Sequence, residues 1–66
     1  MKVGQRVKVR NLNTFETLYG RVISIEENMF DVKPESGHWE TMTFDIRYMN
    51  GLRQYTGWMI EGVLSN

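Results

Sequence analysis

The stretches VGQRVKVR (residues 3–10) and YGRVISIEEN (residues 19–28) decide the fold of this chain. In the first stretch, valines alternate with basic side chains, a period of two that is typical of a half-buried strand over Gln5–Arg10. The second stretch belongs to a longer run, Thr17–Glu26, in which both faces are partly apolar, as in a strand that bends around a small barrel. Gly20 permits such a bend. Two strands of this kind, so close together, predict a strongly curved antiparallel sheet.

The loop between these strands and the strand after them complete the first half of the chain. The loop, Asn11–Glu16, is polar, and we expect Leu12 and Phe15 to fold back from it against the core. A turn at residues 27–28 precedes a short strand, Met29–Lys33. The inward-facing side chains of that strand are expected to be Phe30 and Val32.

The second half of the chain alternates again after a turn at residues 34–37. In the run that begins at His38, one face carries Met42, Phe44, Ile46 and Tyr48, and the other carries Trp39, Thr41, Thr43, Asp45 and Arg47. Asn50-Gly51 predicts a type I′ hairpin, because that turn needs positive φ at both central residues. The chain then returns through Leu52–Trp58, and the apolar pairs at 59–60 and 63–64 either close the barrel or form one helical turn. We therefore expect one all-β domain over residues 1–66, a small barrel of five or six antiparallel strands.

The first half of the chain resembles the SH3-like small barrels of the KOW and Tudor type. In those barrels a GxxVxV strand precedes a GxVxxI strand, a tight turn and a strand that contains valine. The matching residues here are Gly4, Val7, Val9, Gly20, Val22, Ile25 and Val32. The resemblance implies an SH3-like barrel, a fold that serves nucleic-acid binding and peptide binding, and only rarely catalysis. The segment after His38 departs from the pattern because it adds an apparent extra hairpin.

Length and composition exclude several classes of protein. A chain of 66 residues buries only about 60% of the surface that its unfolded form exposes, and without cysteine it has neither a disulfide nor a cysteine-ligated zinc site. A fold this small gains from self-association, so a homodimer is one expectation. No apolar run approaches the ~20 residues that span a bilayer, and the N-terminus lacks the apolar core of an export signal. We expect a cytoplasmic protein, and its length fits a phage, plasmid or bacterial accessory product.

Residue types that carry out catalysis are scarce in this chain. His38 is the single histidine, and the neighbouring carboxylates Glu26 and Glu27 would point to opposite faces of a strand. The chain has no phosphate-binding glycine loop. Type II dihydrofolate reductases are similar in size and in the GxRV strand, but the Gln-Ile-Tyr tripeptide on which their activity depends is missing here. We expect no enzymatic activity, no catalytic residue, no metal site and no cofactor.

The charges, which sum to zero, are unevenly distributed along the chain. Residues 1–25 hold five Lys and Arg against one Glu, whereas residues 26–45 hold one Lys against six Asp and Glu. In the first strand the basic side chains share one face, which Arg21 of the next strand can join. This face predicts contacts with the backbone of a nucleic acid, and nearby aromatic side chains would stack on bases. The predicted nucleic-acid-binding residues are Arg6, Lys8, Arg10, Arg21, Tyr19 and Trp39, with Phe15 as a further stacking candidate.

Two other interpretations of the same residues stay open. In the first, the basic face is an ordinary solvated surface, because lysine and arginine are routine on the outer face of any small barrel. A pI near 6.6 is also low for a nucleic-acid-binding domain. The second interpretation is a protein-interaction module, an adaptor or inhibitor, in which exposed aromatic residues and the acidic segment 26–45 contact a basic partner. The aromatic residues proposed for that role are Trp39, Tyr48 and Tyr55.

Overall fold

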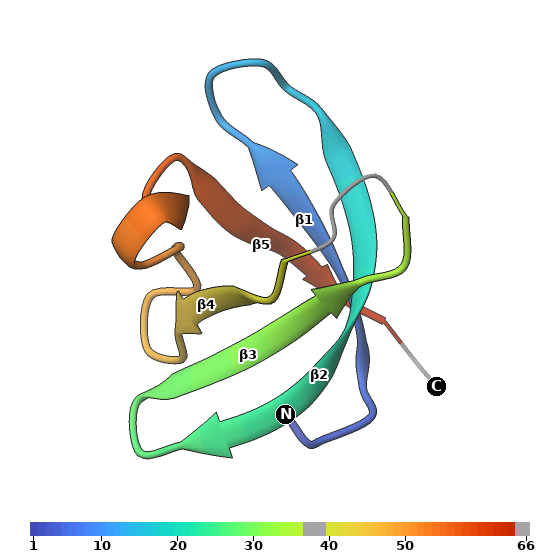
Figure 1. Ribbon diagram of the computed structural model, residues 1–66, viewed down its shortest axis with the longest axis vertical. Coiled ribbons are helices and arrows are strands. Elements are labelled where there is room, and N and C mark those ends of the chain that lie inside the picture. The colour runs from blue at the N-terminus through green and yellow to red at the C-terminus, as the bar shows by residue number, and fades with distance from the viewer. Residues whose placement is uncertain (37–39, 65–66) are drawn as a thin grey trace.

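The computed structural model describes residues 1–36 and 40–64, in which it contains five antiparallel strands and one short 3-10 turn. The elements are β1 (Arg6–Asn11), β2 (Thr17–Glu26), β3 (Met29–Pro34), β4 (Met42–Asp45), η1 (Arg53–Tyr55) and β5 (Trp58–Val63). The strands form one sheet in the order β4-β3-β2-β1-β5, and the sheet curls into a half-barrel (Figure 1). The all-β prediction is confirmed with five strands, and the architecture is consistent with a small SH3-like barrel.

Two β-bulges produce the curvature of the sheet. In β2 the register with β3 shifts after Val22, which leaves Ile23 without a partner. Val22 on one side of the shift is buried, and Ile25 on the other side packs against the core. The bulge therefore explains why both faces of this strand are partly apolar in sequence. A second shift, between Lys8 and Val9, leaves Glu61 of β5 unpaired.

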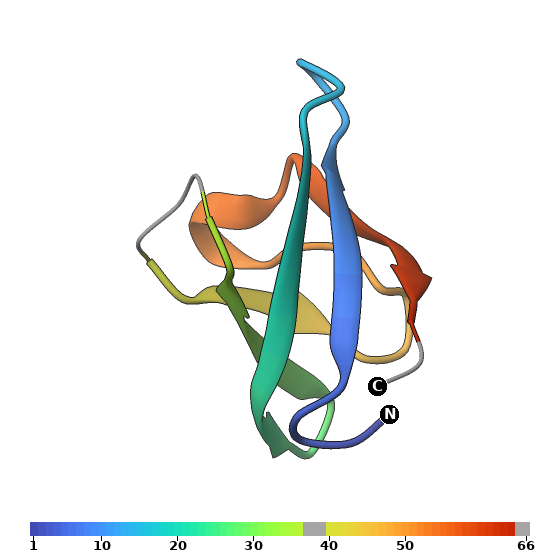
Figure 2. The same ribbon diagram turned by 90° about the vertical axis from the view of Figure 1, so that its right-hand side faces the viewer.

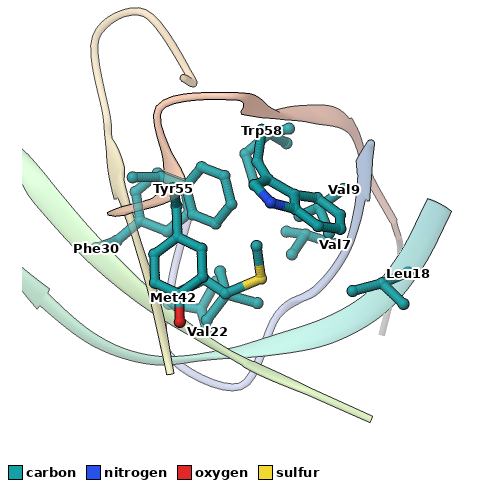
Figure 3. Packing of buried hydrophobic residues seen from close by; sticks show 11 residues of the cluster. Val7, Val9, Leu18, Val22, Phe30, Met42, Tyr55 and Trp58 are labelled. Atoms are coloured by element: carbon teal, nitrogen blue, oxygen red, sulfur yellow. The ribbon is translucent and has the colours of Figure 1, made fainter. Parts of the chain in front are cut away.

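The core fills the concave side of the sheet (Figure 3). The rings of Phe30 on β3 and Phe44 on β4 stack with centroids 5.7 Å apart. The buried hydrophobic residues are Val7, Val9, Leu18, Val22, Phe30, Val32, Met42, Phe44, Tyr55, Trp58 and Ile60. Every strand contributes to this cluster, and η1 contributes Tyr55 from outside the sheet.

The segment 49–52 joins the two edge strands of the sheet. It forms a bridge with Phe44 of β4 through Gly51, and another with Met59 of β5 through Asn50. On the β4 side, the amide of Leu52 donates to the carbonyl of Thr43 at 2.9 Å. On the β5 side, the Gly51 amide donates to the carbonyl of Trp58 at 2.7 Å. The segment therefore acts as a connector between the two edges, and we call residues 49–52 the edge connector.

The expected hairpin at Asn50-Gly51 is wrong, and so is the long strand before it. Strand β4 ends at Asp45, because the Asp45 carboxylate accepts hydrogen bonds from the amides of Arg47 and Tyr48 at 2.7 and 3.2 Å and turns the chain. Met49, with φ of 61°, takes the left-handed conformation that we expected at Asn50 and Gly51. Both of those residues instead form the bridges of the edge connector.

The loop between β1 and β2 also differs from expectation. Leu12 and Phe15 do not fold against the core, since their exposed fractions are 48% and 67%. In both views the loop projects beyond the rest of the barrel (Figures 1 and 2). Hydrogen bonds of the backbone and of the Asn11 side chain hold it in place, as described below.

Candidate nucleic-acid interface

Strand β1 places three basic side chains in one column on the outer side of the sheet. Val7 and Val9 are buried, so the side chains between and beside them point outward. The outward side chains are Arg6, Lys8 and Arg10. Figure 2 views β1 and β2 from this side, in front of the other strands. The sequence therefore predicted the orientation of this column correctly.

Strand pairing extends the column into a row across three strands. Arg6 is the direct partner of Arg21 on β2, and Arg21 is the direct partner of Lys33 on β3. Like charges that are directly opposite destabilise a sheet unless an anion lies between them. We call the surface formed by the column and this row the basic face; its cations are Arg6, Lys8, Arg10, Arg21 and Lys33.

Tyr19 lies in the middle of the basic face. It is the direct partner of Lys8, and 39% of it is exposed. The Arg6 guanidinium carbon lies 4.3 Å from the centre of the Tyr19 ring, and the Lys8 ammonium nitrogen lies 5.9 Å from it. These are cation–π distances, so the ring keeps both basic groups close to the surface of the sheet. The structure thus brings Tyr19 together with the cations, as predicted.

Two carboxylates that we did not predict lie among these cations. Glu35 accepts hydrogen bonds from Nε and Nη2 of Arg6 at 2.8 and 2.9 Å. Glu61 accepts from Nε of Arg10 and forms an ion pair with the Lys8 ammonium at 3.2 Å. Arg6, Lys8 and Arg10 therefore each already contact an anion.

These contacts lower the pKa of both carboxylates. The hydrogen bonds from Arg6, with the positive charges of Arg6 and Arg21, hold the pKa of Glu35 below its ordinary value. The hydrogen bonds from Arg10 and Lys8 do the same for the pKa of Glu61. Arg21 has a different partner, since its Nη1 donates to the carbonyl of Gly4 at 2.9 Å. Arg21 is thus the cation of the predicted set for which no carboxylate contact is present within residues 1–36 and 40–64.

The outward direction of Glu61 could be inferred from the sequence, but that of Glu35 could not. In β5, Trp58 and Ile60 are buried, so the alternation of that strand places Glu61 outward, and this could have been inferred. Glu35 follows the end of β3, where no periodic pattern fixes a direction. Trp39, the last of the predicted site residues, lies outside the described residues, as does His38.

The aromatic residues proposed for a protein interface separate in the structure. Tyr48 is 73% exposed, with the guanidinium carbon of Arg47 at 5.4 Å from its ring centre. Tyr55 is buried, which contradicts its proposed place on an exposed surface; its hydroxyl donates to Glu40 at 2.7 Å. Burial, together with this hydrogen bond, raises the pKa of Tyr55.

A polar cavity of about 150 Å³ lies on another part of the outer surface. Its lining residues are Ser24, Glu26, Met29, Asp31, Thr43 and Arg53. Both carboxylate oxygens of Asp31 accept hydrogen bonds at 2.8 Å, from the hydroxyls of Ser24 and Thr43. The Asp31 carboxylate is thus a cross-strand link, and no group of three metal-ligating residues occurs within the described part of the chain.

Comparison of the chain with protein-family models, with curated proteins and with solved structures gives no match. Among the described residues, no helix is long and apolar enough to cross a membrane. The geometry of the basic face is therefore the basis for any functional assignment.

Proposed function

We propose that this chain is a cytoplasmic, non-enzymatic binding module that contacts the phosphate backbone of nucleic acid through the basic face and needs no cofactor. The observation that carries the proposal is the array of cations on three adjacent strands around Tyr19. Guanidinium and ammonium groups spaced along strands contact successive phosphates and release condensed counterions. The aromatic ring among them adds a surface on which a base stacks.

The resemblance to the KOW and Tudor type of barrel belongs to the same proposal. Val7 and Val9 of β1, and Val22 of β2, occupy positions of that sequence pattern and are buried, which supports an SH3-like core. Since such barrels host several functions, the assignment depends on the basic face rather than on the fold.

Glu35 and Glu61 set the strength of the proposed interaction. Each occupies a place where a phosphate oxygen would accept hydrogen bonds from the same basic groups. A phosphate therefore competes with a directly bound carboxylate at Arg6, Lys8 and Arg10, whereas at Arg21 it competes with the carbonyl of Gly4. We expect binding that weakens steeply as salt is added.

The first prediction concerns neutralisation of single cations on this face. Lys8→Gln and Arg21→Gln should each weaken binding of a labelled oligonucleotide and reduce the slope of log K against log salt by about 1. Fluorescence anisotropy over a salt series measures both quantities. Arg53→Gln is the matched control, because Arg53 belongs to η1 and lines the polar cavity, and it is not one of the cations of the basic face. Absence of binding at the lowest salt concentration, or an equal effect of Arg53→Gln, would contradict the proposal.

Protein interaction is the second candidate function, favoured by the exposed Tyr48. Here the acidic residues of segment 26–45 would contact a basic partner, and a lysine-rich peptide is a suitable probe. Tyr48→Ala should then weaken peptide binding, whereas Lys8→Gln should not. Wild-type protein that binds an oligonucleotide but not this peptide would exclude the second candidate.

A further inference from the structure

Phe15 is the most exposed apolar side chain at the projecting end of the molecule. It belongs to the loop between β1 and β2, which extends beyond the barrel in both views (Figures 1 and 2). Its exposed fraction is 67%, and the neighbouring Leu12 is 48% exposed. An aromatic ring that extends into solvent contributes little to folding, because most of its surface stays in water.

The conformation of the loop is fixed by hydrogen bonds that do not involve the Phe15 side chain. The Asn11 carbonyl accepts from the amide of Phe15 at 2.8 Å, and the Asn11 amide donates to the carbonyl of Glu16 at 2.8 Å. Oδ1 of Asn11 accepts from the amides of Asn13 and Thr14 at 2.8 and 3.1 Å. The loop is also tied to the start of β5, since the amide of Leu12 donates to the carbonyl of Gly57 at 2.7 Å.

The backbone of Phe15 is strained by this conformation. Its φ is 64°, in the left-handed region that glycine and asparagine enter readily and bulky residues rarely adopt. Phenylalanine is therefore a poor choice for this position on two counts, backbone strain and exposure of apolar surface. Residues held in such a strained backbone conformation cluster at sites that contact ligands.

The basic face indicates which ligand this is. The pair Arg10–Thr17 ends the β1–β2 pairing on the side of the loop, so the column of cations leads toward Phe15. A strand of phosphates that follows this column would bring its bases to the projecting ring. Bases of a duplex are stacked on one another and paired, whereas unpaired bases offer free faces to aromatic side chains.

We propose that Phe15 stacks on an unpaired base and that the ligand of this chain is single-stranded nucleic acid. This inference rests on the proposed function of the basic face, and it adds the class of nucleic acid and the residue that selects it.

The test compares an oligothymidine strand with a blunt duplex of equal phosphate number, by fluorescence anisotropy over a salt series. Wild-type protein should bind the single strand more tightly. Phe15→Asn should weaken binding of the single strand by about 5- to 150-fold, the range that stacking of one base spans. Its salt slope should equal that of wild type, because no charge is removed. Phe15→Tyr should retain wild-type affinity, since it keeps the ring.

Thermal unfolding separates a ligand contact from a structural role. Asparagine tolerates positive φ, so Phe15→Asn should unfold at the same temperature as wild type or higher while it binds more weakly. Leu12→Asn, in the same loop but without a ring to lose, is the control and should leave affinity near that of wild type.

The outcomes distinguish this inference from the proposed function. Wild-type binding that Phe15→Asn leaves unchanged, or equal affinity for duplex and single strand, overturns the inference and leaves the basic face as the binding site. Absence of binding to either oligonucleotide overturns both. If Phe15→Asn loses a protein partner but keeps its oligonucleotide affinity, the loop is a protein anchor and the inference is wrong.

Discussion

Gly51 has no space for a side chain, because the chain passes close to itself at the edge connector. A Cβ atom built there would lie 1.7 Å from the carbonyl oxygen of Tyr55 and 2.6 Å from its carbonyl carbon. Both of these atoms belong to the backbone, so relief of the overlap requires η1 to move. The requirement for glycine is therefore one of space, not of positive φ.

We predict that Gly51→Ala lowers the free energy of unfolding by at least about 3 kcal/mol, the upper end of the usual cost of overpacking. Gly62→Ala is the matched control, because a Cβ there meets no atom within 4 Å, and it should change stability by less than about 1 kcal/mol. Urea unfolding followed by tryptophan fluorescence measures both. Equal midpoints for the two variants would show that η1 shifts at little cost.

At the scale of the element, the bulge in β5 creates the internal counter-charge of the basic face. Lys8 pairs with Gly62 and Val9 pairs with Ile60, so Glu61 lies between the paired positions and contacts both Lys8 and Arg10. In a strand without a bulge, each residue would lie opposite one residue of the neighbouring strand. One carboxylate thus serves two cations because the strand is bulged.

The contacts of Glu61 lead to a prediction of stronger oligonucleotide binding, whereas the substitutions on the basic face should weaken it. Glu61→Gln should increase affinity for an oligonucleotide and make the salt slope steeper, by about 1 for each phosphate newly contacted. Glu27→Gln, which removes the same charge from the exposed turn between β2 and β3, is the control and should have a smaller effect. If the two variants gain affinity equally, net charge rather than the Glu61 contacts explains the result.

Elements that follow from a burial pattern could be predicted from sequence, whereas elements that depend on particular backbone contacts could not. The period of two in β1, and in β3 through Phe30 and Val32, depends only on which face is buried, and sequence alone predicted it. The end of β4 depends on the Asp45 carboxylate, which accepts a hydrogen bond from the amide of Arg47, and the place of Gly51 depends on its backbone contacts with β4 and β5. The bridges that pair Asn50 with Met59 and Gly51 with Phe44 form only when the two edge strands come together, so the hairpin inferred from Asn50-Gly51 was wrong.

The same division applies to the candidate site. The outward column of β1 and the position of Tyr19 follow from alternation, and both were predicted from sequence. The pairing of Arg6 with Glu35 joins β1 to the residue that follows β3, and since β1 and β3 are not neighbours in the sheet, no local pattern reveals it. The expected packing of Phe15 against the core was wrong because an apolar residue in a polar loop is usually buried, whereas Asn11 fixes this loop by hydrogen bonds.

At the scale of the whole molecule, three carboxylates from different parts of the chain link stability to pH. Hydrogen bonds from Arg6, Arg10 and Arg47 are the main causes that lower the pKa values of Glu35, Glu61 and Asp45 respectively. The ordinary values are 4.5 for the two glutamates and 3.8 for the aspartate. Because the folded values are the lower ones, these groups stabilise the fold above the ordinary values and cease to do so as pH falls through the folded values.

We therefore predict that the three carboxylates leave the urea midpoint of unfolding unchanged between pH 7 and about pH 5. Below about pH 4.5 this midpoint should fall steadily. The double variant Glu35→Gln with Glu61→Gln should show a shallower fall, since two of the three groups no longer titrate. A midpoint in wild type that is the same at pH 7 and pH 3 would contradict the assigned pKa directions.

The edge connector also bears on how copies of this chain meet one another. An edge strand with bare amides and carbonyls is a template on which a second chain can add a strand, the first step toward aggregation. Here residues 49–52 bond to Thr43 on one edge and to Trp58 on the other, so one short segment shields part of both. Copies of the molecule are thus hindered from joining into a continuous sheet at those positions. We therefore expect less aggregation at high protein concentration than an open sheet edge would cause.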